Sequence, residues 1–372
     1  MTKPAWQSSC ACWARVEPRQ RHTPESCCST EPPMPHVALK EICTLRQWSP
    51  LPRKSFTTSG YPVYGANGQI GYSNRYNHEQ PVIAIACRGN SCGNVSLTPP
   101  FSYVTANAIC AENVRHDILP LYLYYYLKQA DFSRCISGAA QAQITQKALG
   151  ELPIPVCSLQ QQKLIVKRLQ TADKIIHLQQ EQIQAIHTLK HSFYTECFTT
   201  YPREHACPYC TLADIATIQC GKQNAGIATG VGHYPFFSCS KTPKRVNHYH
   251  FDCECVLLTG NIDFQVHYFN GKFDAYQRTY IIESAHADFS VPYLYAFLEH
   301  YIPTLQQQAL GGVIKYLRHS MLSAIRVPLL PAFKRQQLSE FSLKISRVSQ
   351  NATHSLYHTQ QLFCQMLQQA FS

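Results

Sequence analysis

Two closely spaced cysteine pairs are the residues of this chain best suited to hold a metal ion. Cys207 and Cys210 form a Cys-x-x-Cys pair, and Cys253 and Cys255 form a Cys-x-Cys pair. Four thiolates are a common zinc ligand set. The second pair has a spacing unlike that of a zinc ribbon, and no histidine cluster accompanies it. We therefore predict no metal site and interpret these cysteines as free thiols that pack as small apolar residues.

The sequence also lacks the usual motifs of nucleotide-binding enzymes. The sequence has no Gly-x-x-x-x-Gly-Lys-Ser/Thr phosphate loop and no Gly-rich turn suited to a nucleotide cofactor. Thr98-Pro99-Pro100-Phe101 is similar to the Asn/Asp-Pro-Pro-Tyr/Phe motif of amino-methyltransferases. That motif needs an Asn or Asp side chain to accept hydrogen bonds from the target amino group, and a Thr hydroxyl is a poor substitute. We predict a turn between strands here, no catalytic residue, and no cofactor bound by this chain.

The balance of charge points to a polyanionic partner. The 372 residues include 33 Lys and Arg against 22 Asp and Glu, a formal net charge of +11 at pH 7 with the histidines neutral. A surface of that sign attracts nucleic acid. A hydrophobic content of 45% excludes a wholly disordered chain. The length suits about two or three domains.

The 18 cysteines do not indicate a secreted disulfide scaffold, because such scaffolds are short chains with a signal peptide. The first 35 residues hold no apolar signal segment. No stretch approaches the roughly 18 consecutive apolar residues of a membrane span. We therefore predict a cytoplasmic protein with mostly reduced thiols and no membrane partner.

An internal repeat organises the chain. Leu39, Tyr61 and Pro155 recur as Leu212, Tyr234 and Pro328, each 173 positions later, and Leu123 recurs as Leu294 at an offset of 171. Each half ends in a polar, Gln-rich segment. A period of this length indicates a whole domain followed by a further element.

The further element is a long helix in each half. Neither Gly nor Pro occurs from Leu159 to Phe198 or from Phe333 to Phe371, and apolar residues recur there at steps of three and four. Gln179 and Lys190 interrupt the first stripe. A helix of this length reaches roughly 60 Å, which favours two helices packed on each other as a spacer over two helices packed each on its own domain. The predicted helix-packing residues are Ile165, Leu169, Ile176, Ile183, Ile186, Phe341, Ile345, Val348, Leu356 and Phe363.

The globular parts alternate short apolar runs with turns, as Pro81–Ala86 and the following turn Arg88–Asn94 show. Tyr122–Lys128 and Pro292–His300 predict one short helix in each domain. The fold class is therefore α+β. The predicted parts are a disordered leader at 1–35, a first domain at 36–157, a long helix at 158–200, a second domain at 201–331 and a second long helix at 332–372.

At this point the sequence resembles the specificity subunit of type I restriction-modification systems. The order and spacing of the matching segments agree with that family from about residue 36 to the end, densely in the first half and more loosely in the second. The segments are Gly60-Tyr-Pro-Val-Tyr-Gly-Ala-Asn-Gly-Gln-Ile-Gly-Tyr72, Ala86-Cys-Arg-Gly89, Cys92-Gly-Asn-Val95, Thr98-Pro-Pro-Phe-Ser-Tyr-Val-Thr-Ala-Asn-Ala108, Gln143-Ile-Thr-Gln-Lys147 and Leu152-Pro-Ile-Pro155.

The resemblance implies two target recognition domains that each read one half of a split, asymmetric site in double-stranded DNA. It also implies that the two long helices form an antiparallel coiled coil that sets the distance between the half-sites. Such a subunit is not itself a catalyst. It assembles with methyltransferase subunits and with endonuclease/translocase subunits, and the resemblance assigns S-adenosylmethionine (SAM), ATP and Mg to those partners.

Candidate DNA contacts are basic and amide side chains in turns beside the strands. Arg and Lys suit guanine edges and phosphates, whereas Asn and Gln can pair with adenine. The predicted residues are Arg53, Lys54, Asn67, Gln69, Asn74, Arg75, Arg88, Asn90, Ser91, Gln141 and Gln143 in the first domain, and Lys222, Gln223, Lys241, Lys244, Arg245, Asn261, Lys315 and Arg318 in the second.

Two other functions compete with this interpretation. One is an enzyme, such as a fused DNA methyltransferase or nuclease. The other is a coiled-coil or zinc-thiol interaction protein that uses the cysteine pairs.

Overall fold

The computed structural model describes residues 34–138, 142–227, 231–240, 242–261, 264–311 and 315–371. The predicted leader lies outside these residues except for its last two positions. By its contacts the chain divides into two compact units. The first unit contains the described residues up to Tyr124 together with Asp131–Gln162, and the second contains Tyr125–Ala130 and the chain from Lys163 onward.

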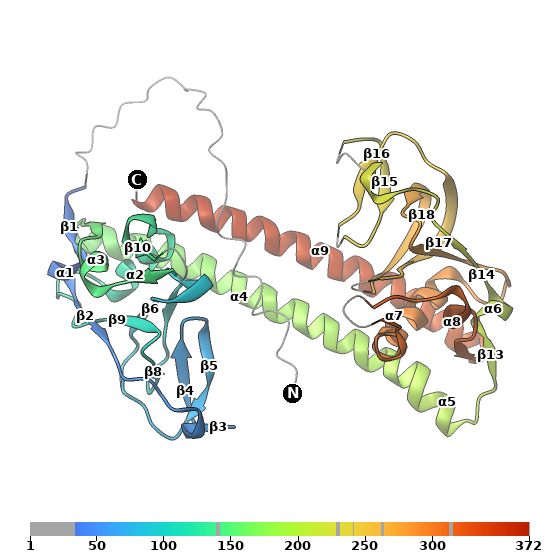
Figure 1. Ribbon diagram of the computed structural model, residues 1–372, viewed down its shortest axis with the longest axis horizontal. Coiled ribbons are helices and arrows are strands. Elements are labelled where there is room, and N and C mark those ends of the chain that lie inside the picture. Colours follow the sequence, from blue (N-terminus) through green and yellow to red (C-terminus); the bar gives the residue numbers. More distant parts are fainter. Residues whose placement is uncertain are drawn as a thin grey trace. The chain divides into compact units, whose positions relative to one another are not determined.

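The first unit is built mainly from short strands (Figure 1). One four-stranded sheet has the order β2-β9-β6-β7 and another has the order β3-β5-β4-β8. All four residues of β6 are buried, which explains its uninterrupted apolar sequence. The elements are β1 (His36–Ala38), α1 (Leu39–Ile42), β2 (Thr44–Gln47), η2 (Arg53–Ser55), β3 (Phe56–Thr57), β4 (Tyr61–Gly65), β5 (Gly68–Ser73), β6 (Ile83–Ala86), η3 (Gly89–Ser91), β7 (Val95–Leu97), β8 (Tyr103–Val104), β9 (Ala108–Glu112), α2 (Pro120–Gln129), η4 (Ser133–Cys135), β10 (Ile136–Ser137), β11 (Gln143–Ile144), α3 (Gln146–Gly150) and β12 (Pro153–Pro155).

The second unit contains a six-stranded sheet of order β14-β19-β17-β18-β15-β16 and both long helices. Its larger core packs α7 and the adjoining strands around buried aromatic side chains such as Tyr293 and Phe297. The elements are α4 (Leu159–Thr195), η5 (Glu196–Thr200), α5 (Tyr201–Glu204), β13 (Tyr209–Thr211), α6 (Leu212–Ile215), β14 (Ala216–Cys220), η6 (Ala225–Ile227), β15 (Tyr234–Phe237), β16 (Lys244–Val246), β17 (Phe251–Thr259), β18 (Val266–Ala275), β19 (Thr279–Ser284), α7 (Val291–Gln308), α8 (His319–Ser323), β20 (Arg326–Pro328) and α9 (Ala332–Phe371).

The two halves repeat the same strand pairing, which confirms the predicted repeat. β1 pairs antiparallel with β12, matching His36 to Pro155, and β13 pairs with β20, matching Tyr209 to Pro328. Each residue of the second pair lies 173 positions after its counterpart in the first pair. The hydroxyl of Tyr122 donates to the Pro155 carbonyl at 2.9 Å, and that of Tyr293 donates to the Pro328 carbonyl at 2.8 Å. Each half therefore closes on itself through the same ribbon and the same buried tyrosine.

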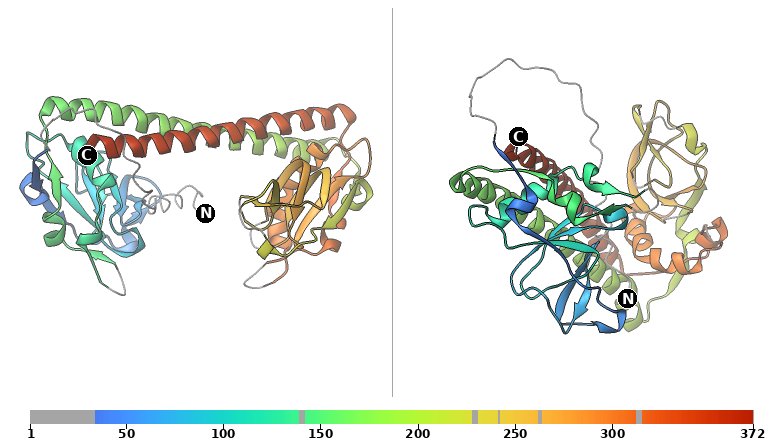
Figure 2. Two further views of the ribbon diagram at one scale, coloured as in Figure 1. Left: turned by 90° about the horizontal axis from the view of Figure 1, so that it is seen from above. Right: turned by 60° about the vertical axis from the view of Figure 1, so that its left-hand side comes forward.

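The two long helices lie side by side and antiparallel within the second unit (Figure 2). The rings of Phe193 on α4 and Phe341 on α9 have centroids 4.1 Å apart. Farther along, the Gln179 amide donates to Ser355 at 2.9 Å. From the first contact to the second, the residue number falls from 193 to 179 on α4 and rises from 341 to 355 on α9. The two helices therefore run antiparallel. The predicted packing of the two long helices on each other is confirmed.

Most of the predicted helix-packing positions face the seam. Leu169, Ile176, Ile186, Ile345 and Phe363 are buried. The half-buried members of the set are Ile165, Ile183, Phe341 and Leu356. The prediction for Val348 is wrong.

Val348 leaves the seam because small polar residues occupy it on this part of α9. Its side chain is 47% exposed, whereas Ser342, six positions earlier, is fully buried and the adjacent Ser349 is half-buried. The stripe of serines follows the three- and four-residue steps that the apolar residues follow elsewhere. An apolar pattern therefore misplaces the seam by one residue at this point.

The last turn of α2 belongs to the second unit rather than the first. The ring of Tyr125 lies 6.3 Å from that of Phe363, and Tyr126 lies 5.4 Å from Phe371. Lys128 approaches Asp173 on α4 at 3.5 Å. Residues 125–130 thus pack against the helix pair. Among the described residues, no helix combines the length and the hydropathy that a bilayer crossing requires.

Candidate DNA interface

Five of the predicted contact residues of the first unit come together around two turns. Asn67 lies in the turn between β4 and β5, and the Ser91 hydroxyl donates to its side-chain oxygen at 3.4 Å. Arg88 pairs with Gln143 in an isolated bridge. Asn90 lies between Arg88 and Ser91, in the short helix η3. The backbone N–H of Gly89, whose φ is +75°, donates to the Ala142 carbonyl at 3.0 Å. We call Asn67, Arg88, Asn90, Ser91 and Gln143 the turn cluster.

A second group lies at the other end of the β4-β5 hairpin. Arg53 and Lys54 form η2, directly before β3, and β3 pairs with β5 so that Phe56 faces Ser73. Asn74 and Arg75 follow Ser73 and are exposed. Gln69, between the two groups, is half-buried. Strand β5, which has six residues and separates the two groups, is about 17 Å long at about 3.4 Å per residue.

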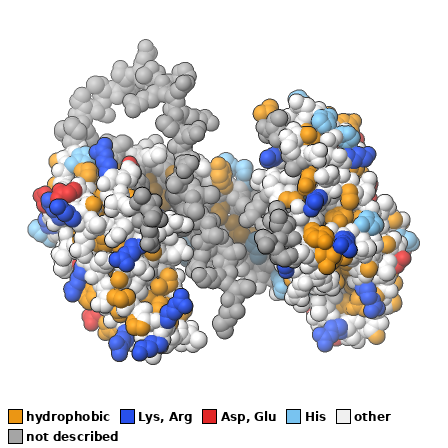
Figure 3. All heavy atoms as spheres, viewed as in Figure 1, with side chains coloured by type: hydrophobic (Ala, Val, Ile, Leu, Met, Phe, Trp, Pro, Cys, Tyr) orange, Lys and Arg blue, Asp and Glu red, His pale blue; other side chains and the backbone are white. Residues whose placement is uncertain are grey.

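The cationic members of both groups have no acidic partner within the described residues. None of the ion pairs found there involves Arg53, Lys54, Arg75 or Arg88, whereas Lys40 and Arg115 pair with Glu151 and Asp117. Figure 3 shows more Lys and Arg than Asp and Glu on the face turned to the viewer. These positive charges are therefore available to an external anion.

The second unit repeats the geometry of the turn cluster with different side chains. Asn261 pairs with Tyr316 in an isolated bridge, 173 positions after the pairing of Arg88 with Gln143. The Asn261 side chain accepts from the Cys239 thiol. Lys315 donates to the Gln306 carbonyl at 2.7 Å, and the Arg318 guanidinium lies 5.9 Å from the Tyr316 ring centroid.

A pocket opens beside this second turn. It is lined by Gly260, Gln277, Arg278, Tyr280, Tyr316 and Leu317. Gln277 and Arg278 are exposed and were not among the predicted contacts. They directly precede Thr279, the first residue of β19. Polar residues in a turn beside a strand are the pattern by which they could have been predicted.

The other described contacts predicted for the second unit lie in two places, the segment after β14 and strand β16. The Lys222 amine lies 5.2 Å from the Phe251 ring centroid, and the Gln223 amide lies 3.4 Å from the His250 ring nitrogens. Arg245 donates to the His233 carbonyl at 3.0 Å, and Lys244 is exposed on β16. Gln141 and Lys241 lie outside the described residues.

Both units also present a pair of tyrosines that are not among the predicted contacts. The ring centroids of Tyr61 and Tyr76 are 4.9 Å apart, and those of Tyr234 and Tyr249 are also 4.9 Å apart. Three of these four side chains are 37–40% exposed. In the first unit Phe101, with a φ of +55°, lies 5.3 Å from Tyr76. Exposed aromatic rings beside free cations are typical of nucleic-acid surfaces.

Comparison with known proteins identifies the first half of the chain. Residues 34–188 match the family model described as the type I restriction modification DNA specificity domain. This part of the chain is therefore similar to a type I restriction DNA specificity domain. The predicted resemblance to the specificity subunits is thereby confirmed.

Two curated relatives are similar to part of the chain. The type I restriction enzyme EcoDI specificity subunit of Escherichia coli is 36% identical over 118 residues, which are 32% of this chain and 26% of that protein. A putative type I restriction enzyme specificity subunit of Haemophilus influenzae is 32% identical over 120 residues, 32% of this chain and 31% of that protein. The chain therefore spans about a quarter to a third of the relatives it matches.

One solved structure shares the fold of nearly the whole chain. The crystal structure of the S subunit of a type I restriction-modification system from M. genitalium aligns with a TM-score of 0.74 and 15% sequence identity. The alignment covers 94% of this chain and 98% of that one. The α+β fold, with two globular parts and two long helices, is thus the fold of that S subunit.

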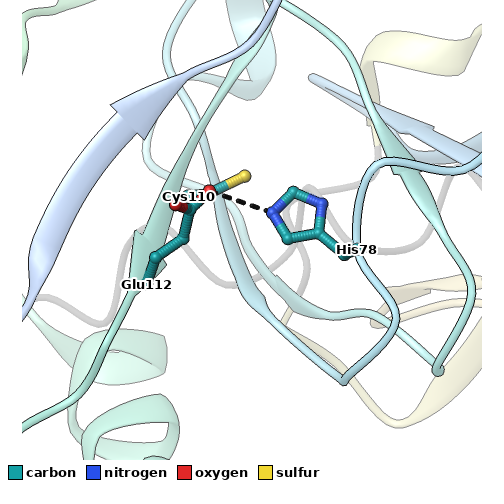
Figure 4. Close-up of side chains that lie close together, drawn as sticks. All are labelled: His78, Cys110 and Glu112. Carbon is teal, nitrogen blue, oxygen red and sulfur yellow. Dashed lines mark hydrogen bonds and ion pairs between the residues drawn. The ribbon is translucent and has the colours of Figure 1, made fainter.

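A buried polar group inside the specificity domain has a structural role (Figure 4). His78 Nε2 lies 3.0 Å from Glu112 Oε1, and the indole N–H of Trp48 donates to the same oxygen at 2.6 Å. Burial lowers the pKa of His78, and Glu112 opposes that shift. The nearby Cys110 is fully buried, and burial raises the pKa of its thiol. The contacts of His78 and Trp48 with Glu112 tie the segment after β5 and the end of β2 to β9.

The two cysteine pairs do not meet in the described structure. Cys207 and Cys210 pack against the core built around α7, whereas Cys253 and Cys255 belong with the smaller core of β17 and β18. Burial raises the pKa of Cys253 to about 11. Thr98–Phe101 forms the turn between β7 and β8, as predicted.

Proposed function

We propose that this chain is the DNA-recognition subunit of a type I restriction-modification complex. In this proposal it reads a bipartite, asymmetric site in double-stranded DNA. It positions methyltransferase and endonuclease/translocase subunits and carries out no chemistry itself. SAM, ATP and Mg belong to those partners, and the complex acts on cytoplasmic DNA.

The repetition of one DNA specificity fold carries this proposal. The first unit matches the specificity family, and the second repeats its strand register 173 positions later. The side chains at equivalent turns differ: Arg88 and Gln143 correspond to Asn261 and Tyr316. Two copies of one scaffold with different turn residues suit the reading of two different half-sites.

The helix pair supports a fixed separation between the half-sites. α4 has 37 residues and α9 has 40, so each extends about 55–60 Å. Side chains from both helices interlock along the seam. A rigid spacer of this length would set how many base pairs lie unread between the half-sites. The rival zinc-thiol function is not favoured, because the cysteine pairs pack in separate cores.

The proposed function predicts a methylation motif that depends on this chain. We expect DNA from cells that express it with its partner subunits to carry a bipartite adenine-methylated motif, absent when the gene is deleted. Sequencing of methylated bases measures this. DNA binding by the assembled complex should also weaken steeply with salt, by about 0.9 log units per phosphate contact for each log unit of salt. An unchanged methylation pattern together with salt-independent binding would refute the proposal.

A single substitution in the turn cluster tests which residues read DNA. We expect Arg88→Ala to weaken binding of the assembled complex to its site by about 10- to 100-fold, because a bidentate base contact contributes about 1–3 kcal/mol. Titration of labelled DNA measures this. Arg347→Ala, an exposed arginine on α9, is the matched control. Equal effects from the two variants would show that Arg88 acts only through bulk charge.

A further inference from the structure

We propose that His248, His250 and Asp274 bind a divalent metal ion of the zinc class in the second unit. Their ligand atoms all lie within 4.8 Å of one another. Asp274 is at the end of β18, and the two histidines precede β17 as a His-x-His pair. Two imidazoles and one carboxylate form a three-ligand set typical of zinc sites that keep a position open.

The geometry already approaches that of a metal centre. His248 Nε2 lies 3.6 Å and His250 Nδ1 2.7 Å from the same oxygen of Asp274, Oδ2. In a tetrahedral zinc site, bonds of about 2.0–2.2 Å place the ligand atoms about 3.3–3.6 Å apart. The first distance fits this range, and the second requires an opening of less than about 1 Å. The two imidazole rings are nearly perpendicular, with an angle of 89° between their planes.

The carboxylate is fixed and buried, while the histidines are accessible. The Asp274 side chain has no exposed surface, and its other oxygen, Oδ1, accepts from the Ala275 N–H at 2.8 Å. Oδ2 is thereby left for the imidazoles. The side chains of His248 and His250 are 56% and 37% exposed, which gives an ion a path from solvent. A buried carboxylate needs a compensating positive charge, and a bound cation supplies it.

The donor set is specific to the second unit. Arg75 and Asn77 occupy the positions 173 before His248 and His250. The parallel strand pairs match Val63 to Tyr103 in the first unit and Phe236 to Asp274 in the second, so Tyr103 stands where Asp274 stands. The first unit therefore offers none of these donors at the equivalent place.

The site adjoins predicted DNA contacts. His248 occupies the position equivalent to Arg75, a predicted contact. The Gln223 amide lies 3.4 Å from the His250 ring. A bound cation would stabilise the segment before β17 and restore positive charge at a place where the first unit has an arginine. The open coordination position would take water or another oxygen ligand.

Cobalt binding to the purified, reduced full-length chain tests the proposal without DNA. We expect one site-specific Co²⁺ whose visible absorption bands lack a strong sulfur charge-transfer band, and Zn²⁺ should displace it. Asp274→Asn and His248→Ala should each weaken this binding at least tenfold, since even outer-shell changes cost about 10- to 100-fold. Absence of binding, or a thiolate spectrum that the variants leave unchanged, overturns the proposal.

One histidine-aspartate pair and one pair of histidines serve as controls. His286 faces Asp288 at 3.7 Å but forms only a two-donor group, so His286→Ala should leave the cobalt signal intact. His354 and His358 lie one turn apart on α9 with their Nε2 atoms 2.8 Å apart. Loss of the signal in His358→Ala but not in His248→Ala would place the metal on α9 and overturn the assignment. Because His248 is exposed, its variant decides the matter even if Asp274→Asn fails to fold.

Discussion

Exchange of residues 36–157 for the same stretch of another specificity subunit is expected to change one half of the methylated motif and leave the other half intact. The reason is that the exchanged stretch contains the turn cluster and both first-unit sheets, while the second unit keeps its own turns. The boundaries lie just outside β1 and β12, whose pairing closes the repeat. Sequencing of methylated DNA from cells that carry the chimera measures the result.

The structure refines how this exchange must be made. Tyr125, Tyr126 and Lys128 lie inside the exchanged stretch but pack against α9 and α4 in the second unit. A chimera that retains residues 125–130 of the present chain should therefore assemble better than one that replaces them. Its control is the reciprocal exchange of residues 201–331, which should alter the other half-site. If either chimera alters both halves, independent reading by the two units is ruled out.

Lys190→Ala is expected to lower the free energy of unfolding of the second unit by about 3 kcal/mol. Lys190 on α4 forms an ion pair with Glu299 on α7, and the two side chains are only 15% and 26% exposed. Removal of one partner leaves the other charge buried without compensation, which typically costs about 3–5 kcal/mol. Urea denaturation of both proteins measures this loss, because a less stable variant unfolds at a lower urea concentration.

Two variants separate this pair from an ordinary surface charge. In Lys190→Met combined with Glu299→Leu, apolar side chains of similar size replace both charges, so most of the lost stability should return. Lys344→Ala removes one partner of an exposed pair on α9, with side chains 78% and 56% exposed. That change should cost less than about 0.5 kcal/mol. Equal losses for Lys190→Ala and Lys344→Ala would contradict the buried-pair explanation.

The long helices and the repeat could be predicted because each depends on regularities along the chain. The absence of Gly and Pro from Leu159 to Phe198 anticipated α4, and the offset of 173 anticipated the matched pairing of β1 with β12 and of β13 with β20. Lys190 interrupts the apolar stripe because its partner lies on α7. A pattern within one helix gives no information about such a partner.

The residues that sequence reasoning missed lie at the ends of paired strands, where the register of the pairing brings them together. His250 and Asp274 are 24 positions apart and meet because β17 and β18 pair antiparallel. Tyr61 and Tyr76 meet at the open end of the β4-β5 hairpin. Val348 was misplaced because serines form the seam around it. Composition and periodicity do not determine which turns of a sheet become neighbours.

The helix pair also affects the order of events during synthesis. Gln179 and Ser355, which bond across the pair, are separated by 176 positions. At about 5–20 residues per second, the ribosome needs roughly 10–35 s to make that intervening chain. During this interval α4 has emerged without its partner helix, and the apolar side chains at Leu169 and Ile176 are exposed to water. The nascent chain thus passes through a stage open to chaperones and to aggregation, which ends only when α9, at the very end of the described chain, is released.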